Sequence, residues 1–181
     1  MMDKMLNLFN NTKRGRTKET IFDEVFEYVP YKSVATLNFG ETAERNITKI
    51  FGKADKIFKN YGVGTTEVYF NSNSDMIQIF YDNEGKLVSI SFAKSIKFIV
   101  YDKIIEINLD DFKISDLNKI SDDFKLTTSY TDYASEKLGI DICFNFDGDY
   151  AVAESILFMS KEHYENEIEY LSPSKNNISK N

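Results

Sequence analysis

The stretch that decides the fold is TTEVYFNSNSDMIQIFYDNEGKLVSISFAKSIKFIVYDKIIEIN, residues 65–108. Its hydrophobic residues recur at every second position through five short runs: Val68, Phe70, Ile77, Ile79, Tyr81, Val88, Ile90, Phe92, Ile96, Phe98, Val100, Ile105 and Ile107. Because successive side chains of a strand point to opposite faces, this period predicts strands with all thirteen residues on one face. The joints at 71–75, 82–85, 93–95 and 102–103 are too short for a parallel crossover. They predict an antiparallel meander.

Helical spacing of apolar residues predicts three helices outside this stretch. The first covers 20–29 and ends before Pro30, because the residue before a proline is pushed out of the α region. The second covers 42–51 and ends at Gly52, where a C-cap glycine belongs. The third covers about 160–170, with a serine as its N-cap.

The remaining segments predict shorter elements. Alternating apolar residues favour strands over 33–39, 56–61 and 125–130. The spacing over 110–120 favours a broken helical segment. A second clear alternation over 140–159 turns at an Asp-Gly-Asp sequence and predicts another hairpin.

The two hairpins share a spacing. Ile77 precedes Gly85 by eight residues, and Ile140 precedes Gly148 by the same distance. This indicates two related hairpin modules, although hairpins also converge on such patterns. The fold class we predict is α+β: an antiparallel β-meander sheet with two or three helices packed on one face or end.

Length and composition indicate one domain. We expect a flexible basic arm at 1–18, a single α+β domain at 19–171 and a disordered tail at 172–181. The chain is 42% hydrophobic, which is enough for a real core.

Charge is distributed unevenly along the chain. Residues 1–105 carry 15 Lys and Arg against 13 Asp and Glu, whereas residues 106–170 carry 5 Lys against 16 Asp and Glu. An acidic half repels polyphosphate and attracts basic surfaces. Nucleic acid is therefore an unexpected partner and a basic protein a plausible one, although acidic faces also serve solubility alone.

The sequence is poor in catalytic groups. His163 is the single histidine, so one chain cannot build a two-histidine metal site. Cys143 stands in the middle of a predicted strand, where a thiol is usually inert and its pKa is raised. The segment 145–149 lacks the ligand pattern of a calcium loop, and 62–64 leads into a strand rather than a helix. We therefore expect no enzyme activity, no metal and no cofactor.

The sequence shows no targeting signal, which favours the cytoplasm. No run approaches the roughly 18 apolar residues of a membrane span, and the first residues lack the pattern of a signal peptide. A single cysteine excludes an internal disulfide and fits a reducing compartment. We expect a cytoplasmic protein with no membrane partner.

The second face of the predicted meander mixes aromatic and polar residues: Tyr69, Gln78, Phe80, Ser89, Ser91, Lys97, Tyr101 and Glu106. Such a face suits protein binding, because rigid aromatic side chains bury area at low entropy cost. The other interpretation is that a helix or the second hairpin covers Tyr69, Phe80 and Tyr101.

The second hairpin, with Gly-Ile-Asp-Ile-Cys-Phe at 139–144 and Ser-Lys-Glu-His-Tyr at 160–164, resembles some bacterial immunity proteins. These are small acidic cytoplasmic partners of contact-dependent or polymorphic toxins, and the likeness covers about the last third of the chain. The resemblance implies that the protein neutralises a cognate toxin, often a basic nuclease, by masking its active or substrate-binding surface. It places partner contacts on acids of the second half and one aromatic anchor: Asp141, Asp147, Asp149, Glu154 and Tyr150.

Two alternatives stay open. One is an enzyme that uses carboxylates on a sugar or a nucleotide. The other is a structural adaptor that adds a strand to the sheet of a partner, for which a long unprotected edge strand would be the sign.

Overall fold

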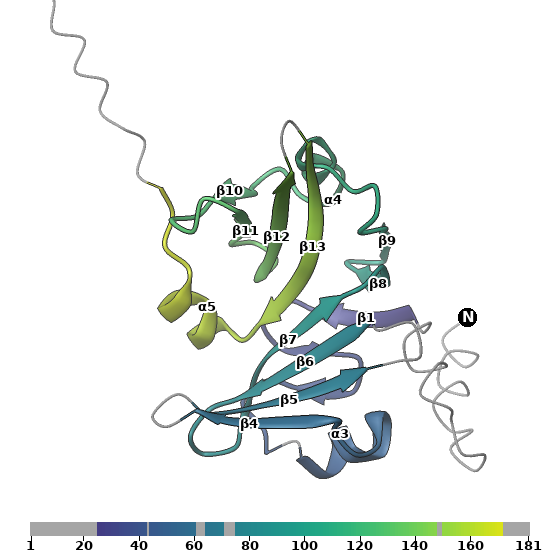
Figure 1. Cartoon of the computed structure of the whole chain (residues 1–181), viewed down its shortest axis with the longest axis vertical. Helices are drawn as coiled ribbons and strands as arrows, with labels where there is room; N and C mark the ends of the chain where they lie inside the picture. The colour runs from purple at the N-terminus through teal and green to yellow at the C-terminus, as the bar shows by residue number, and fades with distance from the viewer. Residues whose placement is uncertain (1–24, 43, 61–63, 71–74, 148–149, 172–181) are drawn as a thin grey trace, which may run out of the picture.

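The computed structural model describes residues 25–42, 44–60, 64–70, 75–147 and 150–171. Over these ranges the chain forms two β-sheets, of eight and five strands, with short helices around them (Figure 1). Most strand pairs are antiparallel, so the α+β class with antiparallel sheets is confirmed. None of the helices in these ranges is long and apolar enough to cross a membrane.

The larger sheet joins both predicted hairpins. In spatial order its strands are β10 (Lys125–Leu126), β11 (Asp132–Ser135), β12 (Ile140–Asp147), β13 (Tyr150–Met159), β7 (Leu87–Ala93), β6 (Met76–Tyr81), β5 (Gly64–Phe70) and β4 (Lys56–Asn60). All neighbours are antiparallel, and β13 pairs with β7 through Ile156 opposite Phe92 and Phe158 opposite Ile90. The two hairpins therefore lie side by side, while their common origin stays a prediction.

The smaller sheet contains a parallel pair. In spatial order its strands are β3 (Leu37–Asn38), β2 (Ser33–Val34), β1 (Val25–Val29), β8 (Ile96–Val100) and β9 (Lys103–Ile107). Strands β1 and β8 run parallel, and the other neighbours run antiparallel.

The predicted single meander is wrong at the joint 93–95. Strand β7 ends in the larger sheet and β8 begins in the smaller one, so this joint is a corner between sheets. Both strands direct alternate apolar residues into one core, and alternation does not say which sheet a strand joins. A second correction concerns β5, where Tyr69 lies opposite Ile77. Val68 and Phe70 therefore face the other side of the sheet.

The predicted first helix is also wrong over the described part. Val25–Val29 is strand β1, in which Phe26 and Tyr28 are buried while Val25, Glu27 and Val29 are exposed. The apolar residues of this segment fit a helical period too, but pairing with β8 satisfies the backbone and buries both aromatic rings. Residues 20–24 lie outside the described ranges.

Three other helical predictions are confirmed. Helix α3 (Glu44–Phe51) ends at Gly52, which adopts a φ of +75°. Residues 114–120 form the 3-10 turn η1 (Ile114–Asp116) and α4 (Leu117–Ile120). Helix α5 (Lys161–Glu167) is capped by the Oγ of Ser160.

One aromatic side chain of the larger sheet lies under a helix, while another of the smaller sheet stays exposed. The ring of Phe51 in α3 lies 5.4 Å from that of Tyr69, which is 2% exposed, so a helix covers this residue. Tyr101 is 68% exposed, so no helix or strand of the described ranges covers it.

Five aromatic rings fill the space between the sheets. Phe158 on β13 lies 4.6 Å from Tyr28 on β1, 5.2 Å from Phe98 on β8 and 5.8 Å from Phe92 on β7. Phe26 extends the cluster at 5.4 Å from Phe92. Edge-to-face contacts of this kind add to the burial of apolar area. The cluster is therefore the core that both sheets share.

Phe158→Ala should destabilise the fold strongly. Removing a buried ring leaves a cavity among three other rings, so we expect the free energy of unfolding to fall by about 3–5 kcal/mol in urea titration. Phe146→Ala on neighbouring β12 is the matched control, because that ring is 47% exposed. Equal losses in the two variants would show that Phe158 is not the centre of the core.

Candidate functional site

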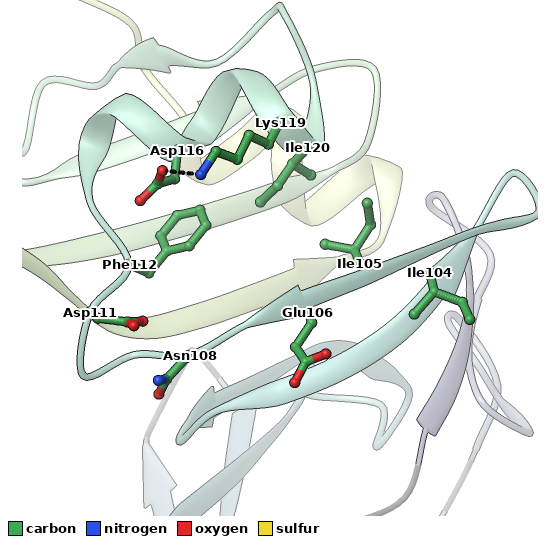
Figure 2. Close-up of a pocket in the computed structure, with 9 residues that line it drawn as sticks. All are labelled: Ile104, Ile105, Glu106, Asn108, Asp111, Phe112, Asp116, Lys119 and Ile120. Carbon is green, nitrogen blue, oxygen red and sulfur yellow. Dashed lines mark ion pairs between the residues drawn. The ribbon is translucent and has the colours of Figure 1, made fainter.

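A groove of about 480 Å³ lies between β9 and the segment that follows it (Figure 2). Nine residues line it: Ile104, Ile105, Glu106, Asn108, Asp111, Phe112, Asp116, Lys119 and Ile120. One wall is strand β9, and the other is the loop and the helical turns of η1 and α4 (Figure 2).

Asn108 fixes the turn that starts the second wall. Its Oδ1 accepts a hydrogen bond from the Oγ of Ser95 at 2.8 Å, which links it to the corner between the sheets. Its backbone oxygen accepts the N–H groups of Asp111 and Phe112 at 3.2 and 2.9 Å. An Asx side chain at such a position replaces regular backbone pairing. The chain therefore leaves β9 in a defined direction.

Phe112 anchors this wall to the larger sheet. Its ring stacks on Phe144 of β12 at 6.4 Å, and its carbonyl accepts the N–H of Ala153 of β13 at 3.1 Å. The side chain is 7% exposed, so it forms a fixed apolar floor rather than a mobile flap. One wall of the groove therefore belongs to the smaller sheet, and the other wall is anchored on the larger sheet.

Three acids are among the lining residues: Glu106, Asp111 and Asp116. Glu106 pairs with Lys97 at 2.7 Å, and Asp116 pairs with Lys119 at 2.6 Å. The hydrogen bond from Lys119 holds the pKa of Asp116 below its usual range. Asp111 forms no ion pair with any residue in the described ranges.

This arrangement suits a cationic and partly apolar ligand. Ile105 and Ile120 offer partly exposed apolar surface above the buried ring of Phe112. Lys97 and Lys119 balance Glu106 and Asp116, so Asp111 leaves the groove with an excess of one negative charge. Among the residues that the structure describes, no group of three or more His, Cys, Asp and Glu could hold a metal ion. The groove can therefore bind a ligand through its charges and its apolar side chains.

The predicted contact residues occupy the second hairpin. Asp141 lies within β12, and Glu154 is exposed on β13. Asp147 and Tyr150 are backbone partners at the hairpin end, while Asp149 lies outside the described ranges. Contacts by the hairpin end and Glu154 stay a prediction.

Asp141 differs from this expectation because its side chain is 8% exposed. It lies opposite Ala134 of β11 and Leu157 of β13, and its Oδ1 has no hydrogen-bond partner in the part of the chain that the structure describes. Burial raises the pKa of Asp141 to about 8, helped by the charge of Asp132 and opposed by the backbone N–H of Ile142. A carboxyl placed inside the protein does not suit a surface contact.

The raised pKa expected for the Cys143 thiol is confirmed. Burial raises the pKa of Cys143 to about 12, and Asp132 adds to the shift through a hydrogen bond and its charge. The thiol therefore stays protonated at neutral pH. Burial lowers the pKa of His163, so this ring stays neutral there.

Sequence reasoning missed the groove. Glu106 belonged to the predicted mixed face, whereas Asp111 and Asp116 looked like ordinary acids of an acidic half. The available signal was Phe112, an aromatic residue among acids directly after a strand. Only the stacking of its ring on Phe144 turns these residues into one site.

No protein-family model and no curated protein matches this sequence. A solved structure of YjgB, a DUF4309 family protein of Bacillus subtilis, is similar with 16% identity and a TM-score of 0.49. The match covers 71% of this chain and 84% of that one. The cysteine-rich secretory protein SAV1118 of Staphylococcus aureus is similar with 16% identity and a TM-score of 0.40, over 82% of this chain and 55% of that one. Neither likeness assigns a function.

Asp141→Asn should remove a pH dependence of stability. The folded-state pKa of about 8 lies above the ordinary value of 3.8, so the protein is most stable below pH 3.8 with respect to this group. Stability is lost as pH rises toward 8, since the unfolded chain ionises first.

The variant should match the wild type near pH 4 and exceed its free energy of unfolding at pH 8 by ~2 kcal/mol or more in urea titrations. Glu154 is an exposed acid on the neighbouring strand, so Glu154→Gln is the control. It should leave the change of the free energy of unfolding with pH as in the wild type. If the free energy of unfolding of Asp141→Asn changed with pH as it does in the wild type, the buried carboxyl would not be the source of the pH dependence.

Proposed function

We propose that this chain is a non-enzymatic protein-binding module, an immunity protein that neutralises a basic bacterial toxin in the cytoplasm. The observation that supports the proposal most is the groove between β9 and α4, which is lined by Glu106, Asp111 and Asp116 together with apolar side chains. A nuclease presents positive charge where its substrate docks, so an acidic groove competes with nucleic acid for that surface.

The wider charge distribution favours the same partner. Residues 106–170 include the second wall of the groove and both strands of the second hairpin, and they carry 16 acids against 5 lysines. Such a field speeds the encounter with a cationic protein before any contact forms. Apolar contact on the partly exposed Ile105 and Ile120 then slows dissociation, because desolvated contacts hold a complex together.

The hairpin end extends this surface in the proposal. Glu154 is exposed on β13, and Asp147 with Tyr150 closes the turn of the same hairpin. We propose that these residues, with Asp149, also contact the partner, as the resemblance to immunity proteins implies. Asp141 is left out because it is buried.

A carboxylate enzyme remains the competing explanation. Two groove acids are engaged by lysines, Glu106 by Lys97 and Asp116 by Lys119, which favours a binding role over a free acid and base. Loss of turnover on a sugar or nucleotide in Asp111→Asn alone would favour the enzyme.

Asp111→Lys should weaken the proposed interaction. The test partner is the protein encoded next to this chain in its own genome, expressed in Escherichia coli with and without the chain. We expect co-expression to rescue growth. In stopped-flow measurements at low salt, the variant should lower the association rate constant about tenfold and flatten its salt dependence.

Glu136→Lys is the matched control, because Glu136 is an exposed acid in the turn between β11 and β12 and does not line the groove. If both variants slow association equally, the groove is not the contact. If the neighbouring protein is neither toxic nor bound, the immunity function is wrong.

A further inference from the structure

Strand β9 is the last strand of the smaller sheet. In the described part of the chain it pairs with β8 alone, from Ile96 opposite Ile107 to Val100 opposite Lys103. An edge strand directs the N–H and C=O groups of every second residue away from its sheet, where another strand can pair with them. The groove opens beside this edge, because Ile104, Ile105 and Glu106 line it (Figure 2).

The other sheet edges differ from β9 in length or in charge. Strands β3 and β10 are only two residues long, which is too short to hold a partner strand. Strands β4 and β9 are both five residues long and both expose apolar side chains, Ile57 and Phe58 on β4 and Ile104 on β9. Strand β4 carries two lysines, which repel a basic strand, whereas β9 carries one lysine and Glu106 and lies beside the groove.

Exposed apolar residues continue from this edge over the outer face of the sheet. Ile104 is 63% exposed and lies opposite Ile99, and Tyr101 in the turn between β8 and β9 is 68% exposed. On β1, Val25 is 42% exposed and pairs with Lys97, the partner of Glu106. An open edge and an exposed apolar face thus meet at Ile104.

We propose that the β9 edge receives an extended strand of the basic partner protein, which rests on the function proposed above. The register of β9 defines the sequence that fits. Apolar residues belong opposite Ile104 and Ile105, where they reach the outer face and the floor at Phe112 respectively. Basic residues belong opposite Glu106, which shares the outer face with Ile104, and near Asp111, which lines the groove. Backbone pairing then supplies affinity, and side chains on both faces supply specificity.

The probe is the peptide acetyl-Lys-Val-Arg-Val-Ile-Lys-amide, titrated into the full chain labelled with nitrogen-15. We expect the largest amide shifts on β9 and around Asp111. A peptide with Asp in place of Arg and Lys should bind at least ~10-fold more weakly, because like charges meet in the groove. No binding of the basic peptide, or shifts away from β9, would overturn the proposal.

Backbone methylation separates strand addition from simple charge attraction. Two further peptides carry N-methyl groups on alternate amides, one set on each edge of the extended chain. Methylation of the edge that faces β9 should abolish binding, and methylation of the other edge should leave it within about threefold. Equal behaviour of the two peptides would overturn strand addition, while the proposed function would survive if the toxin still binds the acidic groove.

Ile104→Lys tests the same edge in the protein. The site is exposed, so the substitution should leave the fold intact while weakening the basic peptide at least ~10-fold through charge repulsion. Ile57→Lys on the edge strand β4 is the matched control, at 54% exposure, and should bind normally. If sedimentation instead gives a dimer that Ile104→Lys dissociates, the occupant is a second copy and the proposal is wrong.

Discussion

The contact of Phe158 with Tyr28 and Phe98 joins the two sheets and supports the rest of the structure. Tyr28 belongs to β1, Phe98 to β8 and Phe158 to β13, so one cluster of rings connects three segments that are far apart in sequence. The hydroxyl of Tyr28 donates a hydrogen bond to the carbonyl of Leu138. Burial raises the pKa of Tyr28, which keeps this donor protonated. The smaller sheet is therefore fixed on the larger one by both packing and a polar contact.

The groove depends on this arrangement because one wall is a strand of the smaller sheet and the other wall is anchored on the larger sheet. Strand β9 brings Glu106 from the smaller sheet, and Phe112 is held by Phe144 of the larger one. The bond between Ser95 and Asn108 ties the corner between the sheets to the start of the groove. A change in how the sheets meet would therefore change the distance between Glu106 on β9 and the wall that carries Phe112.

Local pattern predicted most strands but not their partners. Alternation located the strands from 64 to 107 and the hairpin of β12 and β13, because a half-buried strand has a period of two whatever its neighbours are. It could not reveal the corner at 93–95, since both strands point into the same core. Residues 25–29 form a strand because they pair with β8, and the local sequence around Phe26 and Tyr28 does not show this partner. The groove was unpredictable for the same reason: Phe112 holds the second wall in place only by packing on Phe144 of β12, far along the chain.

The parallel pairing of β1 with β8 has a consequence for how the chain folds. Val25 pairs with Lys97, and no turn near β1 brings the two strands together. Loop closure over such a separation has to occur before the pairing can stabilise anything, so contacts of this kind slow folding. During synthesis, β1 must wait until β8 leaves the ribosome, and the shared aromatic core must wait for Phe158 on β13. The last-made hairpin therefore completes the core, and a chain cut short before it would leave apolar faces open to aggregation.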